Sequence, residues 1–144
     1  MWLYKDTEYK EINNEELYGF IYKITYKSGK WYIGKKNFYH TISLPMLNNF
    51  KKRKNHINFT YSIGSGKRIY KERIKKETNW INYNGSSKSN ISEPIVKKEI
   101  LEFALSKRHL TYLETKYLFL NNALEDEYSI NENILGKFYK NNLI

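Results

Sequence analysis

The stretch 19–36, GFIYKITYKSGKWYIGKK, constrains the fold more strongly than any other part of the chain. Apolar and aromatic residues alternate with other residues over 19–26, which is typical of a strand with one buried face. The KSGK segment that follows suits a three-residue loop in which Gly29 takes a left-handed conformation. The stretch therefore predicts an antiparallel hairpin of two short strands.

The length of this loop decides where the two tyrosines of the hairpin point. A two-residue loop would place Tyr22 and Tyr32 on opposite faces of the hairpin. A three-residue loop pairs Tyr26 with Lys30 and Ile24 with Tyr32, so that both tyrosines share one face as diagonal neighbours. We predict the three-residue loop and a shared face.

The composition limits the classes of protein that need to be considered. A chain of 144 residues fits one domain, and no apolar run approaches the length of a membrane span. There is no cysteine, which excludes disulfides, thiolate metal sites and cysteine nucleophiles. The N-terminus lacks the apolar core of a secretory signal, so we expect an intracellular, cytoplasmic protein with no membrane partner.

The chain carries a net charge of +10 and has a pI near 9.5. Such an excess favours a polyanionic partner, because Lys and Arg that neutralise phosphates release counterions. The alternative is a basic protein from a genome that favours Lys, Asn and Ile codons. Charge alone leaves both interpretations open.

The stretch 37–79 has the least regular pattern, since Leu44-Pro45 breaks any element. A dense basic run, 51–54, is followed by His56, and it is either a solvated loop or a phosphate contact. Ser65 could cap a helix over 67–77 that turns its basic residues outward. The segment 62–67 lacks the first glycine of a phosphate-binding P-loop, so we exclude ATP binding.

Two more elements follow with clearer patterns. The stretch 95–103, after Pro94, predicts a third strand. The stretch 107–124 predicts a helix, because its leucines recur at three- and four-residue steps. Glu114 falls within the apolar arc of this helix, where a carboxylate is costly to bury unless it is paired or binds a metal. A salt bridge with one of the many lysines is the alternative role.

Several of these segments together resemble the GIY-YIG nuclease family, and in particular free-standing phage homing endonucleases. The resemblance covers roughly 19–135. Its segments, in the family's order, are Phe20-Ile21-Tyr22, Tyr32-Ile33-Gly34 with Lys35-Lys36, Trp80, Tyr83, Gly85-Ser86-Ser87-Lys88, the strand KKEIL, the helix TYLETKYLF with Glu114, and the segment 128–134.

The resemblance implies an α+β fold, with a small three-stranded antiparallel sheet flanked by helices. It also implies that Tyr22 and Tyr32 lie beside the scissile phosphate, where one of them helps to activate the attacking water. A phenol with an ordinary pKa of about 10 needs a nearby cation or metal-bound hydroxide for that role. Glu114 matches the glutamate that holds a single Mg²⁺ (or Mn²⁺) ion, and no further small-molecule cofactor is expected.

The family also places a cation against the phosphate, usually an arginine soon after the YIG tripeptide. Here no arginine follows Gly34 before Arg53, so Arg53, Arg68 and Arg73 are the candidates, with Arg73 preferred narrowly over Arg53. His56 matches a histidine that the family often has near this site. The residues expected to contact phosphate or DNA carry amino, hydroxyl or amide groups, and they are Lys35, Lys36, Lys51, Lys52, Ser86, Ser87, Lys88 and Asn131.

The sequence thus predicts a metal-dependent endonuclease that hydrolyses phosphodiester bonds of double-stranded DNA, of the homing type found in phages and mobile elements. Its host would be a bacterium, including a bacterium infected by a phage. We expect an N-terminal extension over 1–18, the nuclease domain over 19–135 and a C-terminal tail over 136–144. A DNA-binding module that keeps this fold without catalysis is the alternative.

Overall fold

The structure is a computed structural model that describes residues 1–86 and 92–144. The chain divides into two compact units. The first unit consists of Met1–Phe38 and Asn79–Ile144, and the second of Tyr39–Thr78. Each unit has its own sheet, and each is described by itself below.

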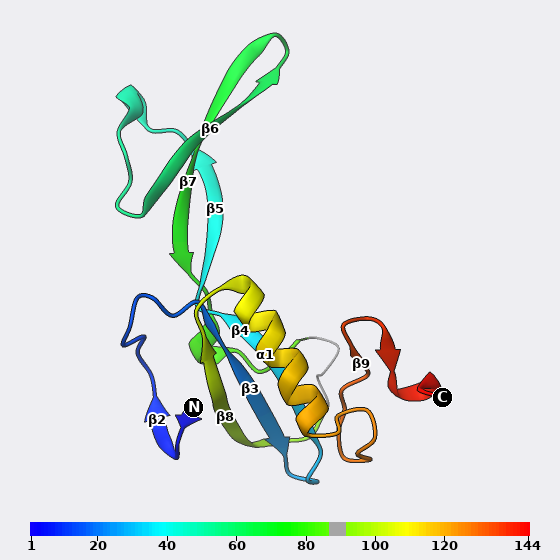
Figure 1. Cartoon of the computed structure of the whole chain (residues 1–144). Coiled ribbons are helices and arrows are strands. Elements are labelled where there is room, and N and C mark those ends of the chain that lie inside the picture. Colours follow the sequence, from blue (N-terminus) through cyan, green and yellow to red (C-terminus); the bar gives the residue numbers. More distant parts are fainter. Residues whose placement is uncertain (87–91) are drawn as a thin grey trace. The chain divides into compact units, whose positions relative to one another are not determined.

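A five-stranded mixed sheet with the strand order β2-β1-β8-β3-β4 forms the centre of the first unit (Figure 1). Its strands are β1 (Trp2–Tyr4), β2 (Thr7–Tyr9), β3 (Gly19–Tyr26), β4 (Trp31–Asn37) and β8 (Ile95–Ala104). Strand β1 runs parallel to β8, and the other neighbours are antiparallel. The third strand expected over 95–103 is confirmed, and two short N-terminal strands join the same sheet.

The β3–β4 hairpin has the predicted three-residue loop. Ile24 lies opposite Tyr32, and the backbone N–H of Tyr26 donates to the carbonyl oxygen of Lys30 at 2.9 Å. Gly29 takes a φ of 91°, a conformation that costs glycine little because it has no Cβ atom. The prediction that this turn sets the register is confirmed.

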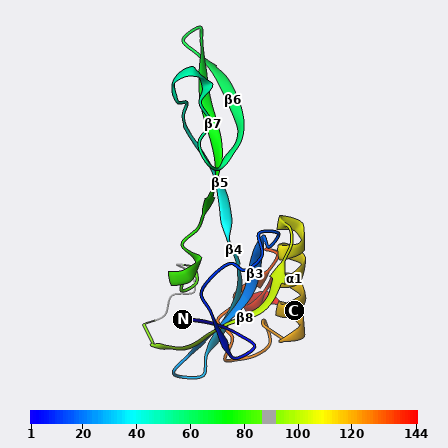
Figure 2. The same cartoon turned by 90° about the vertical axis from the view of Figure 1, so that its left-hand side faces the viewer.

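Helix α1 (Lys107–Leu120) packs against β3, β4 and β8 on one face of this sheet (Figure 2). The hydroxyl of Ser106 caps the helix by accepting a hydrogen bond from the backbone N–H of His109 at 3.0 Å. The predicted helix is confirmed, although it ends at Leu120 rather than near Leu124. At 14 residues it is the longest helix in the described part of the chain, and it is too short and too polar to span a bilayer.

The two faces of the sheet bury different kinds of side chain. Under α1 the core is mainly aliphatic, and Ile21, Ile33 and Leu113 are at most 2% exposed. The opposite face holds an aromatic cluster, whose most buried members are Trp2, Phe20, Tyr22, Phe38 and Trp80. Trp80 belongs to a short 3-10 helix, η2 (Trp80–Asn82), and its carbonyl oxygen accepts a 2.7 Å hydrogen bond from the indole of Trp2.

The C-terminal segment of the first unit lies along the outer edge of β4. Ser129 forms a parallel bridge with Trp31, whose N–H donates to Tyr128 and whose carbonyl accepts from Ile130, each at 2.9 Å. The chain then forms a small hairpin of β9 (Asn133–Ile134) and β10 (Phe138–Tyr139), followed by η4 (Lys140–Asn142). The edge of β4 is therefore paired rather than open.

The second unit is a three-stranded antiparallel sheet with the order β5-β7-β6. Its elements are β5 (Tyr39–Pro45), η1 (Asn48–Phe50), β6 (His56–Gly64) and β7 (Lys67–Glu77). The helix predicted over 67–77 is wrong, because this stretch is the central strand. Ser65 and Gly66 have φ values of 53° and 76°, which is the conformation of a two-residue hairpin turn between β6 and β7.

A buried carboxylate organises one face of this second sheet. Glu72 on β7 is fully buried. It accepts hydrogen bonds from the backbone N–H of Arg53 at 2.8 Å and from the guanidinium of Arg53 at 2.6 Å, and it contacts Nδ1 of His56 at 2.7 Å. Burial alone would raise the pKa of Glu72, but the hydrogen bonds from Arg53 and His56 outweigh it and lower the pKa.

The expected fold, a small three-stranded antiparallel sheet flanked by helices, is therefore wrong. The described residues form a five-stranded sheet, a three-stranded sheet and a two-stranded hairpin, with α1 as their single α-helix. The difference has two sources. The N-terminal residues extend the first sheet, and the stretch 39–78 forms a sheet of its own.

Replacing Glu72 by Gln should loosen the second unit, because the guanidinium of Arg53 then loses its buried counter-charge. We expect amide hydrogen exchange in β5, β6 and β7 to become roughly tenfold faster or more. Glu8→Gln, at an exposed position of β2 in the first unit, is the control and should leave these rates unchanged. Equal effects of the two substitutions would show that the Arg53–Glu72 pair does not organise this sheet.

Candidate active site

Tyr22 and Tyr32 lie on the same face of the hairpin, as predicted from the loop length. Their ring centroids are 6.2 Å apart. Tyr22 is 1% exposed and belongs to the aromatic cluster, whereas Tyr32 is half-buried at the edge of the sheet. The hairpin thus presents one tyrosine to solvent and supports it with another.

Gly34 gives the Tyr22 ring the space that it occupies. A Cβ atom at Gly34 would overlap the hydroxyl oxygen of Tyr22 and would lie 2.9 Å from Cε1 of Tyr32. Any side chain at this position would therefore displace one of the rings. The glycine is therefore required because Tyr22 lies opposite it in the register and crosses β4 there.

Both phenols are held in their neutral form. Burial raises the pKa of Tyr22, and the nearby Tyr32 and Tyr83 hydroxyls raise it further. Burial also raises the pKa of Tyr32, a hydrogen bond with Ser86 opposes this shift, and the charge of Glu114 adds to it. At neutral pH each tyrosine can donate a hydrogen bond, and neither is ionised without an added cation.

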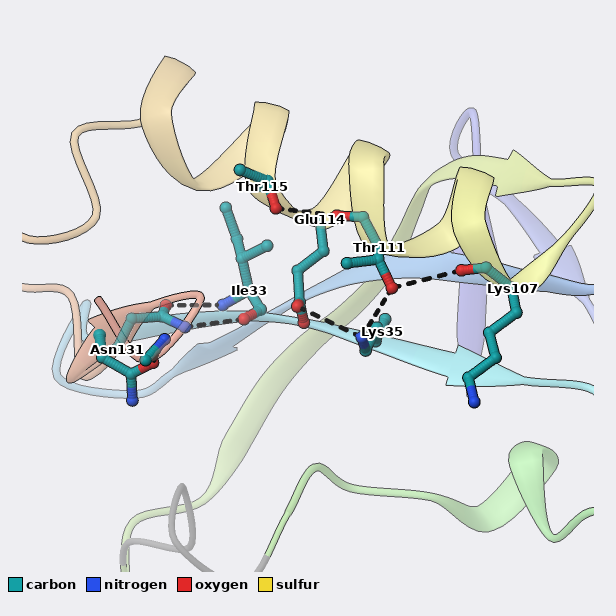
Figure 3. Close-up of polar contacts among 9 residues, drawn as sticks. Ile33, Lys35, Lys107, Thr111, Glu114, Thr115 and Asn131 are labelled. Atoms are coloured by element: carbon teal, nitrogen blue, oxygen red, sulfur yellow. Dashed lines mark hydrogen bonds and ion pairs between the residues drawn. The ribbon is translucent and has the colours of Figure 1, made fainter. Parts of the chain in front are cut away.

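Helix α1 brings Glu114 to the same edge of the sheet. Its carboxylate lies 3.9 Å from Nζ of Lys35 on β4, and this Nζ also donates to the hydroxyl of Thr111 at 3.2 Å. Figure 3 shows the Glu114 side chain pointing from the helix toward Lys35. Burial raises the pKa of Glu114, and Lys35 only partly opposes the shift.

These side chains surround one cavity of about 340 Å³. The hairpin, the helix, the loop after η2 and the C-terminal segment each contribute polar residues to its wall, namely Tyr32, Lys35, Ser86, Thr111, Glu114, Asn131, Glu132 and Asn133. The cavity therefore joins the hairpin tyrosine to the helical carboxylate, which are far apart in sequence.

Asn131 fixes the position of β4 within this wall. Its side-chain oxygen accepts a hydrogen bond from the N–H of Ile33 at 3.0 Å, and its amide nitrogen donates to the carbonyl of Ile33 at 2.8 Å (Figure 3). The residue is 5% exposed. Its side-chain amide thus makes the two hydrogen bonds to Ile33 that the backbone of a neighbouring strand would otherwise make. The expected contact of Asn131 with phosphate stays a prediction.

The two lysines after Gly34 have different surroundings. Lys35 is exposed and lines the cavity. Lys36 is half-buried, its Nζ lies 4.3 Å from the centroid of the Tyr83 ring, and burial lowers its pKa. Lys36 therefore contacts Tyr83, whose ring in turn packs against Tyr22.

The remaining predicted site residues belong to the second unit or to the segment 87–91. Five of them belong to the second unit, namely Lys51, Lys52, Arg53, His56 and Arg73. Arg53 and His56 bind the carboxylate of Glu72, whereas Arg73 is half-buried on β7. Ser87 and Lys88 lie outside the described residues.

Sequence reasoning missed three polar residues of the cavity wall, namely Thr111, Glu132 and Asn133. Thr111 stands three residues before Glu114 on the helix, and side chains at this spacing are neighbours, so the helical pattern could have identified it. Glu132 directly follows Asn131, but it lies outside any helix or strand pattern that could have predicted its position in the wall. It places a second carboxylate in the wall.

Asn131→Ala should destabilise the first unit, because it leaves the N–H and the carbonyl of Ile33 without their partner. We expect the free energy of unfolding in urea to fall by about 3 kcal/mol. Asn133→Ala is a suitable control, since its exposed side chain caps only the N–H of Gly136, and it should cost about 1 kcal/mol or less. Equal costs would contradict the role of Asn131 in holding β4.

Glu114→Gln should stabilise the protein at neutral pH. Because the pKa of Glu114 is raised on folding, the folded state holds this proton more tightly than the unfolded chain does, and stability falls as the pH rises through the titration. Glutamine avoids this loss, so we expect a gain of about 1 kcal/mol near neutral pH.

The gain should disappear below the ordinary glutamate pKa of 4.5, where the carboxyl is protonated in both states. Urea unfolding at several pH values measures it. Glu127→Gln, at an exposed position, is the control and should show no such pH dependence. A Glu114→Gln protein less stable than the wild type near neutral pH would show that the Lys35 contact outweighs the burial of the carboxylate.

Comparison with known proteins gives one match. The model of the family described as "Putative endonuclease segE, GIY-YIG domain" matches residues 2–143. No curated protein and no solved structure matches the chain. The match spans nearly the whole chain, including the tyrosine hairpin, the helix with Glu114 and the second unit. The chain therefore belongs to the SegE-type family of GIY-YIG endonuclease domains.

Proposed function

We propose that the protein is a metal-dependent endonuclease that hydrolyses phosphodiester bonds in double-stranded DNA. The observation that carries this proposal is the convergence of Tyr32, Lys35 and Glu114 on one cavity. A phenol, an ammonium group and a carboxylate are the groups that phosphodiester hydrolysis needs to position water, neutralise phosphate and hold a cation.

The surroundings of Glu114 fit a divalent cation that keeps most of its water ligands. Burial disfavours the charged carboxylate, and Lys35 at 3.9 Å compensates it weakly. The described residues contain no group of three or more acidic or histidine side chains that could enclose an ion. A single carboxylate with water and phosphate oxygens is a normal arrangement for Mg²⁺, and Mn²⁺ would fit the same donors.

Such an ion would stabilise the charge that develops on the phosphate and on the leaving oxygen. The protein's own residues would orient the reactants. Tyr32 faces the cavity, so its hydroxyl is placed to hold the attacking water or a phosphate oxygen. Tyr22 is buried behind it and acts as a positioning residue, through its packing against Tyr32 and Gly34.

Lys35 is the cation best placed to contact the phosphate. It lines the cavity and is held between Thr111 and Glu114. The resemblance implies an arginine in this role, but Arg53 is paired with Glu72, and among the described residues no arginine lines the cavity. We therefore assign the role to Lys35 and regard Lys36, with its lowered pKa and its contact with Tyr83, as support for the tyrosines.

The finer assignments rest on the sequence. The order of segments from the GIY-like tripeptide to the segment 128–134 resembles free-standing phage homing endonucleases, which supports a DNA substrate and a mobile-element origin. A DNA-binding module without catalysis is the competing function. It would share the basic charge and would not need the carboxylate of Glu114.

A plasmid-cleavage assay separates these functions. With Mg²⁺ present we expect the wild type to cut, and Glu114→Gln to lose about 100-fold or more in rate, because it loses the anionic ligand of the metal. Glu127→Gln removes an exposed carboxylate outside the cavity and should cut at the wild-type rate. Chelation of the metal by EDTA should stop the reaction.

Two outcomes would contradict the proposal. A wild type that binds DNA and cuts none of it with Mg²⁺ or Mn²⁺ would favour the module without catalysis. Undiminished cutting by Glu114→Gln would remove Glu114 from the site. Binding of the uncut duplex by Glu114→Gln should be measured alongside, since retained binding shows that the variant is folded.

A further inference from the structure

The positive charge of the protein is concentrated in the second unit. Residues 39–78 contain ten Lys and Arg residues against two Glu residues, a net charge of +8 out of the +10 of the whole chain. The first unit is more than twice as long and carries the remaining +2. This distribution singles out the second unit as the attachment point for a polyanion.

The strand register divides these residues between two faces of the sheet. Alternate residues of a strand point to opposite faces, and directly paired residues of neighbouring strands share a face. Glu72 on β7 pairs with Leu44 and Phe59, and these residues share the face that Arg53 approaches. We call this side of the sheet the covered face. Phe50 lies on it and packs edge-on against Phe59 and Tyr70.

The other face, which we call the open face, is made of basic and small polar side chains. Lys67, Lys71, Arg73 and Lys75 lie along it on the central strand, interrupted by Ile69. The residues paired with them on the flanking strands are mainly hydroxyl or amide residues, namely Thr41, Ser43, Asn58 and Thr60, and Ser62 lies opposite Ile69. Most of these side chains are exposed.

The two acidic residues of the unit hardly oppose this charge. Glu72 lies on the covered face, where it is paired with the guanidinium of Arg53 and contacts His56. Glu77 lies only at the end of the open face, beyond Lys75 and paired with Tyr39. A row of ammonium and guanidinium groups flanked by short hydroxyl and amide groups matches the donors that bind phosphates and sugars of a nucleic-acid backbone.

We propose that the open face of the β5-β7-β6 sheet binds the backbone of duplex DNA and attaches the substrate to the nuclease unit. This inference rests on the proposed function for the identity of the polyanion as DNA. It adds a second site, distinct from the cavity at Glu114, that holds the substrate without taking part in the chemistry.

The placement of the aromatic rings favours a duplex over a single strand. Proteins that bind single strands stack bases on aromatic side chains. In this unit Phe50, Phe59, Tyr61 and Tyr70 belong to the covered face, while Tyr39 stands at the end of the open face, with Lys75 over its ring at 4.1 Å. The open face therefore offers charge and hydrogen bonds along its length rather than a stacking platform.

The size of the open face also suits a duplex. The eight residue steps from Lys67 to Lys75 span about 26 Å of strand, which equals the rise of about eight base pairs. Each phosphate neutralised by a lysine contributes about −0.9 to the slope of log affinity against log salt concentration. Three lysines on one strand should therefore be visible in the salt dependence of binding.

The test compares three triple variants of the full chain, each of which removes three positive charges. The open-face variant is K67Q/K71Q/K75Q. The variant K51Q/K52Q/K54Q changes the basic run in the same unit, and K27Q/K30Q/K116Q changes exposed lysines of the first unit. Binding to a short duplex is measured in EDTA, so that cleavage plays no part, at several salt concentrations.

We expect the open-face variant to weaken duplex binding by about tenfold or more beyond either other variant, and to reduce the salt slope by about 2 to 3. A single strand of the same length should bind the wild type more weakly than the duplex. Equal losses in all three variants, or a larger loss in K51Q/K52Q/K54Q, would overturn the assignment to the open face. A single strand that binds as tightly as the duplex would overturn the choice of ligand.

Lysine acetylation of the wild type, read by mass spectrometry, tests the same site without any variant. Duplex DNA should protect Lys67, Lys71 and Lys75 more than Lys27 and Lys116, and uniform protection would overturn the proposal. Failure of the proposed function looks different, because a protein that never cuts could still show this binding pattern. Conversely, Mg²⁺-dependent cutting with no loss of binding in the open-face variant would overturn only this inference.

Discussion

The close approach of Tyr22 to the backbone of Gly34 is the constraint on which the site depends. The three-residue loop sets the register that places these residues opposite each other, and the missing side chain at Gly34 lets the ring lie across β4. Tyr32 then packs on Tyr22 at the edge of the sheet. A slip of one residue would send every side chain of β4 to the other face and separate the tyrosine from the cavity.

The edge position of β4 explains how one cavity collects residues from distant parts of the chain. Helix α1 approaches β4 from one face with Glu114, and the segment that ends in Asn131 pairs along its outer edge. Some residues of the site stabilise the fold, and others destabilise it. Asn131 satisfies the backbone of Ile33, while Glu114 keeps a carboxylate where burial disfavours its charge. A residue that costs stability and faces a cavity is more readily explained by function than by folding.

The sequence predicted the parts of this protein that are determined locally. The loop composition was enough for the hairpin register, and the leucine spacing was enough for α1 and the inward position of Glu114. The second unit could not be predicted because Ser65 suits a helix cap, and Ser65-Gly66 equally suits a two-residue hairpin turn. The parallel pairing of β1 with β8 depends on contacts across most of the chain, which no local pattern records. For the same reason the buried Arg53–Glu72 pair could not be predicted, and a basic run looked like a free loop.

The central claim is that Glu114 holds a divalent cation within reach of Tyr32. Anomalous diffraction from crystals of the wild-type protein soaked in Mn²⁺ tests it most directly. We predict a peak about 2.2 Å from the Glu114 carboxylate, inside the cavity that Tyr32 and Lys35 line, and no such peak in crystals of Glu114→Gln. A peak elsewhere on the protein, with none beside Glu114, would show that Glu114 does not hold the ion.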